Sequence, residues 1–201
     1  FKPARPTLLL RRVKAEYAKR FKLEWTEPLG FNNTFAILVR DDDAKKLGLK
    51  TVSDAAQVSS QWRAGFGQDF MSRADGYAGF SKAYGLHFEA TREMDLSLTY
   101  RALAENQVDL IAGNSTDGLI ARYGLFQLDD DRHYFPPYDA VPVARQTTLE
   151  KYPALREVLK QLAGILTVDE MRKLNYAVDG EKRQAKDVAR EFLRQKGFAG
   201  R

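Results

Sequence analysis

Apolar residues recur at every fourth position near the start of the chain, at Leu9, Val13, Tyr17 and Phe21. This spacing aligns them along one side of a helix, so the pattern predicts a helix over residues 8–21. A run rich in β-branched and aromatic residues follows at 34–39 and predicts a strand. The acidic triplet at residues 41–43 is then expected to form a turn.

Further short runs predict strands in the middle of the chain, at residues 62–66, 86–90, 108–113 and 125–128. The run at 108–113 is apolar throughout, which is typical of a strand covered on both faces of its sheet. Because these strands alternate with helical patterns, the middle of the chain is predicted to be an α/β unit.

The helical patterns carry their own boundary signals. Ser53 is a candidate N-cap, and Gly85 is expected to end a helix over residues 70–84. Another helix is predicted over residues 95–106. Its inward side is expected to carry Leu98, Ala102 and Leu103.

The pattern becomes mainly helical after a loop that contains Pro136 and Pro137. These two prolines exclude a central strand in the loop. One more strand is predicted at residues 140–145, followed by three helices with breaks at Gly164 and Gly180. The chain is predicted to have three parts: part of a first lobe at 1–32, a second lobe at 33–137, and a mainly helical return to the first lobe at 138–201. The chain then crosses between the lobes twice, and clefts between lobes are common ligand sites.

The amino-acid composition excludes only a few classes of function. The 201 residues are 44% hydrophobic and 11% aromatic, which suffices for packed cores. Lysine and arginine exceed aspartate and glutamate by only 32 to 27, so no nucleic-acid partner is predicted. The basic stretch at 11–22 fits a solvated helix face better than a phosphate-binding face. Cysteine is absent, which excludes disulfides, thiol catalysis and thiolate zinc sites.

The candidate catalytic and nucleotide-binding motifs of the sequence are each incomplete. "GNSTDG" approaches the Gly-x-Ser-x-Gly turn around Ser115, but Asp117 stands where the final glycine is needed. Neither His87 nor His133 has a spacing that marks it as a base. "GFGQDF" has Phe70 in place of the third glycine of a dinucleotide fingerprint. The sequence therefore predicts neither an enzyme nor a bound cofactor.

The acidic triplets at 41–43 and 129–131 lack the alternating ligands and distal glutamate of an EF-hand loop, so no metal site is predicted. Aromatic and amide residues instead gather at the two crossings: Phe31, Asn32, Asn33, Thr34 and Phe35 at the first, and Tyr134, Phe135 and Tyr138 at the second. Core packing is one interpretation. The other is that ring faces hold an organic cation whose charge no hydrogen bond can satisfy.

Five stretches occur in a recognisable order: "GFNNTFA", "SRADGY", "VDLIAGNSTDGLI", "LDDDRHYFPPYDAVPVAR" and "MRKLNYAVDG". With them the chain, from Arg11 onward, resembles the substrate-binding components of glycine betaine/choline/carnitine ABC importers. The resemblance implies an α/β type II periplasmic-binding-protein fold, in which two lobes with two hinge crossings close on a ligand. Family chains usually open with a further βα segment that has no counterpart here, so the first lobe is expected to be incomplete.

The resemblance also implies ligand-binding residues. Phe35 and Tyr138 match aromatic positions of the family's ammonium cage. A third cage tyrosine falls on Asn114, which indicates a cation that also carries hydrogen-bonding groups, or a cage completed elsewhere. Arg73 matches a position that can pair with a ligand carboxylate; the alternative is an ion pair with a neighbouring aspartate, Asp69 or Asp75.

The amides of Asn32 and Asn33 are expected to orient the ligand or to fix the hinge backbone, with capping of a strand end as the structural alternative. Asp117 is interpreted as structural, in the first turn of a helix.

The function that the resemblance implies is capture of a small quaternary ammonium ligand and its delivery to the membrane subunits of an ABC permease. The protein would act at the periplasmic or extracellular face of the membrane, as a lipoprotein or a permease-fused domain. The alternative is the ligand-sensing effector domain of a transcription regulator, because some of these share the fold.

Overall fold

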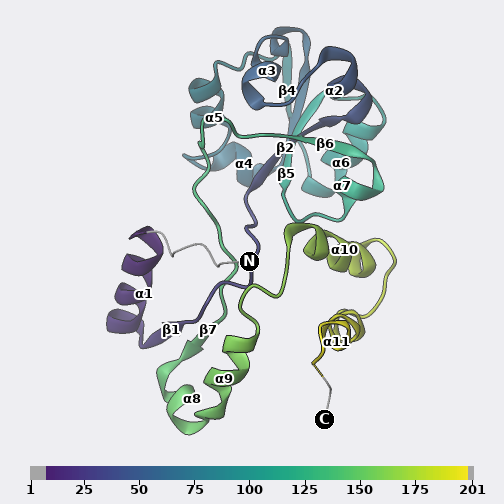
Figure 1. The fold of residues 1–201 in the computed structure, drawn as a ribbon. Helices are drawn as coiled ribbons and strands as arrows, with labels where there is room; N and C mark the ends of the chain where they lie inside the picture. Colours follow the sequence, from purple (N-terminus) through teal and green to yellow (C-terminus); the bar gives the residue numbers. More distant parts are fainter. Residues whose placement is uncertain (1–7, 199–201) are drawn as a thin grey trace.

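The computed structural model describes residues 8–198, in two regions joined by two crossing segments (Figure 1). Residues 35–135 form the sheet lobe, a five-stranded sheet with its covering helices. Residues 8–25 and 143–198 form the outer region, and residues 26–34 and 136–142 are the crossing segments. The ends of the predicted segments 1–32 and 138–201, and the side chain of Leu9, lie outside the described part.

The sheet has the strand order β4-β3-β5-β2-β6. Its strands are β2 (Phe35–Arg40), β3 (Arg63–Phe66), β4 (Ala90–Glu93), β5 (Leu110–Asn114) and β6 (Leu125–Leu128). β3 runs parallel to β4 and β5, whereas β2 runs antiparallel to β5 and β6. The strand predicted at 86–90 is wrong in its position, because pairing with β3 begins only at Ala90.

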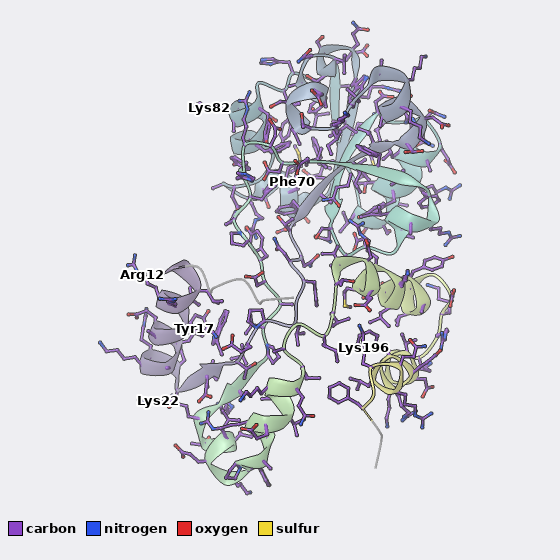
Figure 2. All side chains as sticks on the ribbon, in the orientation of Figure 1. Arg12, Tyr17, Lys22, Phe70, Lys82 and Lys196 are labelled. Carbon is purple, nitrogen blue, oxygen red and sulfur yellow. The ribbon has the colours of Figure 1, made fainter. Side chains whose placement is uncertain are left out.

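Both faces of the sheet are covered, and the central strand β2 shows why its sequence is apolar throughout. Ile37 and Val39 join one core cluster, whereas Ala36 and Leu38 join the cluster on the opposite face. Successive side chains of a strand point to opposite faces, so both sets of β2 residues are buried. Phe70 lies inside the lobe in the all-side-chain view of Figure 2.

The helices of the sheet lobe are α2 (Asp41–Leu47), α3 (Val52–Ala56), the 3₁₀ turn η1 (Ser59–Gln61), α4 (Gln68–Ser72), α5 (Tyr77–Tyr84), α6 (Leu96–Ala104) and α7 (Leu119–Arg122). The turn expected at 41–43 is instead the first turn of α2. Carboxylates at this end of a helix interact favourably with the positive end of the helix dipole. The cap of α3 is Thr51, not Ser53, and it forms a capping box with Asp54.

Two further predictions for these helices need correction. The helix expected over 70–84 is interrupted after Ser72, where the backbone of Arg73 becomes extended (ψ 145°), and it resumes at Tyr77. It does end at Gly85, whose left-handed conformation (φ 69°) suits glycine. In α6, Leu98 is 54% exposed rather than inward.

The outer region contains α1 (Leu8–Phe21), the two-stranded sheet of β1 (Leu23–Trp25) and β7 (Val143–Arg145), and the helices α8 (Gln146–Lys151), α9 (Ala154–Gln161), α10 (Val168–Asp179) and α11 (Ala185–Gln195). The helix predicted at 8–21 is confirmed. Pro153 precedes α9 and separates it from α8, so the pattern taken for one helix before Gly164 is two.

The crossing segments pair with each other over most of their length. The amide of Leu29 donates to the carbonyl of Ala140 (2.8 Å), and that of Asn33 donates to the carbonyl of Tyr138 (3.1 Å). In return, the amide of Ala140 donates to the carbonyl of Phe31 (3.1 Å). The two segments therefore form one ribbon rather than two independent linkers.

Helix α10 adds a third connection, because it lies against α7 of the sheet lobe (Figure 1). Its Arg172 donates from Nε to the carbonyl of Ser115 (2.6 Å), and Asn175 donates to the carbonyl of Thr116 (2.9 Å). The turn at 114–118 is thereby held from the outer region.

Candidate ligand-binding site

A small hollow of about 160 Å³ lies where the crossing segments leave the sheet lobe, and it is called the crossing hollow below. Its lining consists of Asn33, Phe35, Asp69, Arg73, Asn114 and Tyr138. Phe35 begins β2 and Asn114 ends β5, and the two residues are direct partners in the sheet register. The structure thus brings together five of the six residues that the resemblance indicated, while Asn32 lies outside this lining.

Phe35 is supported by other rings and is partly covered. Its ring centroid lies 4.9 Å from that of Phe70 and 5.5 Å from that of Phe135. The guanidinium of Arg73 lies 5.7 Å from the Phe35 centroid, within cation–π range. The ring is therefore held rigidly, and Arg73 already occupies part of its surface.

Arg73, Asp75 and Tyr138 form one hydrogen-bonded group. Arg73 donates from Nε to Asp75 Oδ1 and from Nη2 to Oδ2, both at 2.8 Å. The Tyr138 hydroxyl donates to Asp75 Oδ2 (3.0 Å) and accepts from Arg73 Nη2 (3.4 Å). Of the two pairings proposed for Arg73 within the chain, the structure contains the one with Asp75.

This group shifts the pKa of its members. The hydrogen bonds from Arg73 lower the pKa of Asp75 to about 2. Burial raises the pKa of Tyr138, and the hydrogen bond to Asp75 adds to that rise. Asp75 is therefore ionised, and Tyr138 neutral, throughout the physiological range.

The two asparagines of the first crossing segment use their amide oxygens within the chain. Asn32 Oδ1 accepts from the backbone amide of Tyr138 (2.7 Å), and Asn33 Oδ1 accepts from the hydroxyl of Thr116 (2.7 Å). Asn32 thus fixes the opposite crossing segment, and Asn33 fixes the 114–118 turn. Their observed contacts fit the hinge-fixing alternative.

Asn114 differs from them, because its carboxamide has no hydrogen-bond partner among the described residues. Its backbone amide is held by the Tyr100 hydroxyl (3.2 Å) and by Asp117 Oδ2 (3.3 Å). Asp117 is structural, as expected, but it precedes α7 rather than lying in its first turn. The Asn114 side chain is fixed at its base and free at its tip.

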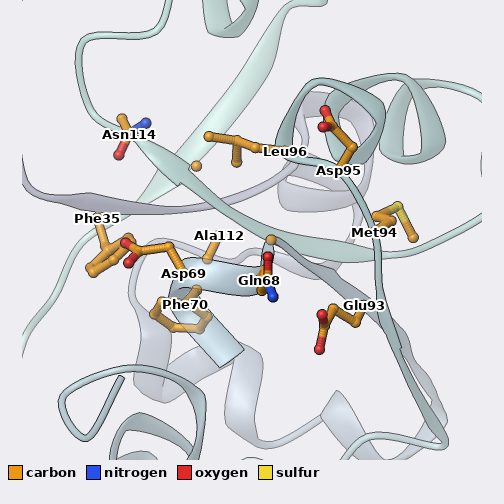
Figure 3. A pocket seen from close by; sticks show the side chains of 12 residues that line it. Phe35, Gln68, Asp69, Phe70, Glu93, Met94, Asp95, Leu96, Ala112 and Asn114 are labelled. Atoms are coloured by element: carbon orange, nitrogen blue, oxygen red, sulfur yellow. The ribbon is translucent and has the colours of Figure 1, made fainter. Parts of the chain in front are cut away.

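A larger pocket of about 570 Å³, the acidic pocket, adjoins the crossing hollow and shares Phe35, Asp69 and Asn114 with it (Figure 3). It also contains Glu93 and Asp95, and none of its described lining residues is lysine or arginine. It lies beyond the carboxyl ends of the parallel strands β3, β4 and β5, where α/β sheets commonly bind ligands.

The acidic pocket is not predicted from the sequence. From the sequence, Asp69 is named only as a possible partner of Arg73, and Glu93 lies between the strand predicted at 86–90 and the helix predicted over 95–106. The sequence does contain one signal for this pocket, because each of its carboxylates lies at the end of a strand or shortly after one. Only the strand order of the folded sheet brings these ends together.

Ser115 has a structural role in the described residues. Its hydroxyl donates to the carbonyl of Asn32 (3.0 Å) and accepts from the amide of Thr34 (3.1 Å). It therefore ties the 114–118 turn to the first crossing segment. No group of three or more His, Asp or Glu side chains with metal-binding geometry is found among the described residues.

Comparison with known proteins supplies the wider context. Residues 6–195 match the family model described as the substrate binding domain of ABC-type glycine betaine transport systems. The carnitine transport binding protein OpuCC of Listeria monocytogenes is 42% identical over 194 residues, covering 96% of this chain and 63% of the relative. The ergothioneine transport permease/ergothioneine binding protein EgtU of Helicobacter pylori is 36% identical, covering 92% of this chain and 34% of the relative.

Solved structures of binding proteins are also similar to this chain. The crystal structure of a glycine betaine/carnitine/choline ABC transporter protein has a TM-score of 0.89 at 39% identity, covering 96% of this chain and 71% of that one. Lactococcal OpuAC in complex with glycine betaine, at 13% identity and a TM-score of 0.61, shares the fold.

The relatives named here are binding or transport proteins, and they give no support to the transcription-regulator alternative. The chain spans less than two thirds of OpuCC. The predicted α/β binding-protein fold and the predicted family are both confirmed. The chain belongs to the substrate-binding domains of ABC-type glycine betaine transport systems.

Proposed function

We propose that this chain is the ligand-capturing part of a solute-binding protein that delivers a quaternary ammonium compound to an ABC permease. The observation that carries the proposal is the crossing hollow, where the rings of Phe35 and Tyr138 meet the carboxylate of Asp69 and the free amide of Asn114. Ring faces attract a desolvated organic cation, and the carboxylate adds a favourable field. The amide provides hydrogen bonds for a further polar group on the ligand.

Capture would use the paired crossing segments as a hinge. The second lobe, predicted at residues 33–137 and containing the sheet lobe, presents a rigid half of the site, and a first lobe that includes residues 1–32 and 138–201 closes over it. The ligand is bound and released without chemical change. Carnitine, glycine betaine, choline and ergothioneine are the candidate ligands, because relatives or their solved structures are named for them.

The proposed place of action is the outer face of the membrane, next to the permease subunits. A lipoprotein and a permease-fused domain would both place the chain at that face. EgtU is named as permease and binding protein together. Among the described residues, no helix has the length and apolar character needed to span a bilayer.

Isothermal titration calorimetry of the 201-residue chain with those four compounds tests the proposal. We expect saturable binding of at least one compound, and a loss of about 30-fold in affinity for Tyr138→Ala, since a desolvated cation–π contact contributes about 2 kcal/mol. Tyr138→Phe retains the ring and should retain most of the affinity. Tyr152→Ala removes an exposed tyrosine outside the hollow and is the matched control.

Absence of heat with all four compounds would refute the proposal for this chain. So would equal losses in Tyr138→Ala and Tyr152→Ala, because the second variant leaves both rings of the hollow intact.

A further inference from the structure

We propose that Arg172 is a positioning residue, which couples the docking of α10 on the sheet lobe to ligand binding at Asn114. This role rests on the function proposed above, and it belongs to a residue of the outer region that does not line the crossing hollow. The coupling is reciprocal: docked α10 holds Asn114 in place for the ligand, and a bound ligand strengthens the docking of α10.

The 114–118 turn connects the candidate site with α10. Asn114 is the last residue of β5, and it lines the crossing hollow. The next two residues, Ser115 and Thr116, are only 4% and 5% exposed. Buried backbone carbonyls need hydrogen-bond partners within the protein, so the conformation of this turn depends on what surrounds it.

α10 supplies partners for both of these carbonyls. Arg172 Nε donates to the carbonyl of Ser115 (2.6 Å), and the Asn175 side chain donates to the carbonyl of Thr116 (2.9 Å). Arg172 Nη2 also donates to the side-chain oxygen of Gln127 on β6. The Arg172 side chain is 20% exposed, and its bonds are charge-assisted, which makes them the stronger part of this contact.

The hydrogen bonds of Asn114 explain how α10 can act on the site. The Asn114 backbone amide donates to the Tyr100 hydroxyl (3.2 Å) and to Asp117 Oδ2 (3.3 Å). The Asp117 amide donates back to the Asn114 carbonyl (3.0 Å), so Ser115 lies inside a closed hydrogen-bonded turn. A shift of the Ser115 carbonyl therefore moves the neighbouring Asn114 and the carboxamide that the ligand would meet.

The docking of α10 is a suitable element for such coupling, because it depends mainly on polar contacts. Ala177 is the one buried residue of α10 in the described structure. Elements with few buried apolar contacts open at low free energy, so we expect α10 to undock locally without unfolding of the sheet lobe. Docked and undocked α10 are the two states whose populations a ligand can shift.

Calorimetry of the 201-residue chain measures this coupling, with carnitine, glycine betaine, choline and ergothioneine as probes. Arg172→Leu keeps an apolar stem but removes the donors, and we expect it to weaken binding about tenfold, a usual size for coupling between sites. Arg172→Lys keeps a charged donor and should restore most of the affinity. Lys173→Leu removes an exposed charge from the same helix, and it should leave the affinity unchanged.

A double-mutant cycle distinguishes positioning from a general structural role. Asn114→Ala removes the carboxamide through which Arg172 is proposed to act. Arg172→Leu should therefore cost no further affinity in the Asn114→Ala background. A general disturbance of the fold would instead weaken binding by the same factor in both backgrounds.

Hydrogen exchange tests the reverse direction of the coupling. A saturating concentration of a binding probe should slow the exchange of residues 168–179 about tenfold in the unmodified chain, because the coupling factor is the same in both directions. This protection should disappear in Arg172→Leu and in Asn114→Ala.

The outcomes separate this role from the proposed function. Unchanged affinity in Arg172→Leu, or a tenfold loss that persists in the Asn114→Ala background, would overturn the role of Arg172 and leave the proposed function standing. If Arg172→Leu lacks a native circular dichroism spectrum, Asn175→Ala removes the neighbouring bond, and the same cycle with Asn114→Ala decides. If none of the four compounds binds to the unmodified chain, the proposed function fails and the coupling fails with it.

Discussion

The sheet lobe and the outer region are built from similar amphipathic patterns but differ in how completely they bury them. In the sheet lobe, large side chains such as Phe66, Phe70 and Phe80 are almost fully enclosed. The outer region buries few apolar residues among those described: Leu10, Leu149, Ala177 and Val188. An apolar stripe therefore specifies a helix, whereas a closed core requires a second apolar surface to cover that stripe.

Helix α9 illustrates the difference. Leu155, Val158, Leu159 and Leu162 follow helical spacing, yet no residue of α9 is buried in the described structure. The crossing hollow lies at the border between these regions, and its rings rest on the well-packed side. The stability of the site is therefore expected to follow the sheet lobe.

The largest expected effect compares one phenylalanine from each region. Phe80 is fully buried and contacts the rings of Phe70, Tyr84 and Phe135, so Phe80→Ala should lower the free energy of unfolding by about 3–5 kcal/mol. Phe21 is 53% exposed, so Phe21→Ala should cost less than about 1 kcal/mol. Urea unfolding of both variants measures the difference. Similar midpoints would mean that the outer region has a core of equal importance.

A smaller effect is expected where α10 meets the sheet lobe. A Cβ at Gly118 would lie 2.5 Å from the Cβ of Tyr176 on α10, so Gly118→Ala should cost about 1–3 kcal/mol through overpacking. Gly67→Ala is the matched control, because its Cβ would meet Leu96 at an ordinary 3.6 Å. Hydrogen exchange of residues 168–179 should accelerate in the first variant only. Unchanged exchange would show that α10 is not held by this contact.

Helix caps provide a more local comparison, since each region has one capping box among its described residues. Thr51 caps α3 with Asp54, and Thr167 caps α10 with Glu170. Alanine at either threonine should destabilise the first turn of its own helix by about 1 kcal/mol. Only Thr51→Ala should lower the urea midpoint, because α3 buries Val52 in the main core, whereas Thr167→Ala should appear as faster exchange at the start of α10. Thr51→Ser should restore the midpoint, and a failure to restore it would contradict a capping role.

Much of the fold could be predicted from the sequence where local pattern alone decides. The helix at 8–21 and the strand at 125–128 follow from periodicity and apolar content. The break between α4 and α5 could not be predicted in this way, because α4 ends where the backbone of Arg73 becomes extended (ψ 145°), and Arg73 is neither a proline nor a glycine. The outward position of Leu98 likewise depends on where the rest of the lobe lies.

The same division applies to the candidate site. The motif positions Phe35, Arg73 and Tyr138 do meet at one hollow, although their binding of a ligand stays a prediction. The partner of Arg73 could not be chosen from the sequence, because Asp69 and Asp75 lie at similar distances along the chain. The bend after α4 decides in favour of Asp75, which accepts hydrogen bonds from both Nε and Nη2 of Arg73.

Acid should produce the smallest effect, and it compares one carboxylate from each region. Hydrogen bonds from Arg73 lower the pKa of Asp75 to about 2, and the hydrogen bond from Lys196 is the main cause that lowers the pKa of Glu170. A carboxyl group whose folded pKa lies below its unfolded value stabilises the fold above the unfolded value, near pH 4, and loses that contribution as the pH falls through the folded pKa. Both side chains are about one third exposed or more, so the contributions are small and screened by salt.

Carboxyl-carbon NMR titration measures the two groups directly. Asp75 should titrate near pH 2, and the signal should vanish in Asp75→Asn, which should also flatten the dependence of stability on pH between about 4 and 2. Titration of Asp75 at its ordinary value, near pH 4, would mean that Arg73 is not held in solution. Because Glu170 joins α10 to Lys196 beyond α11, acid should also loosen that end of the outer region.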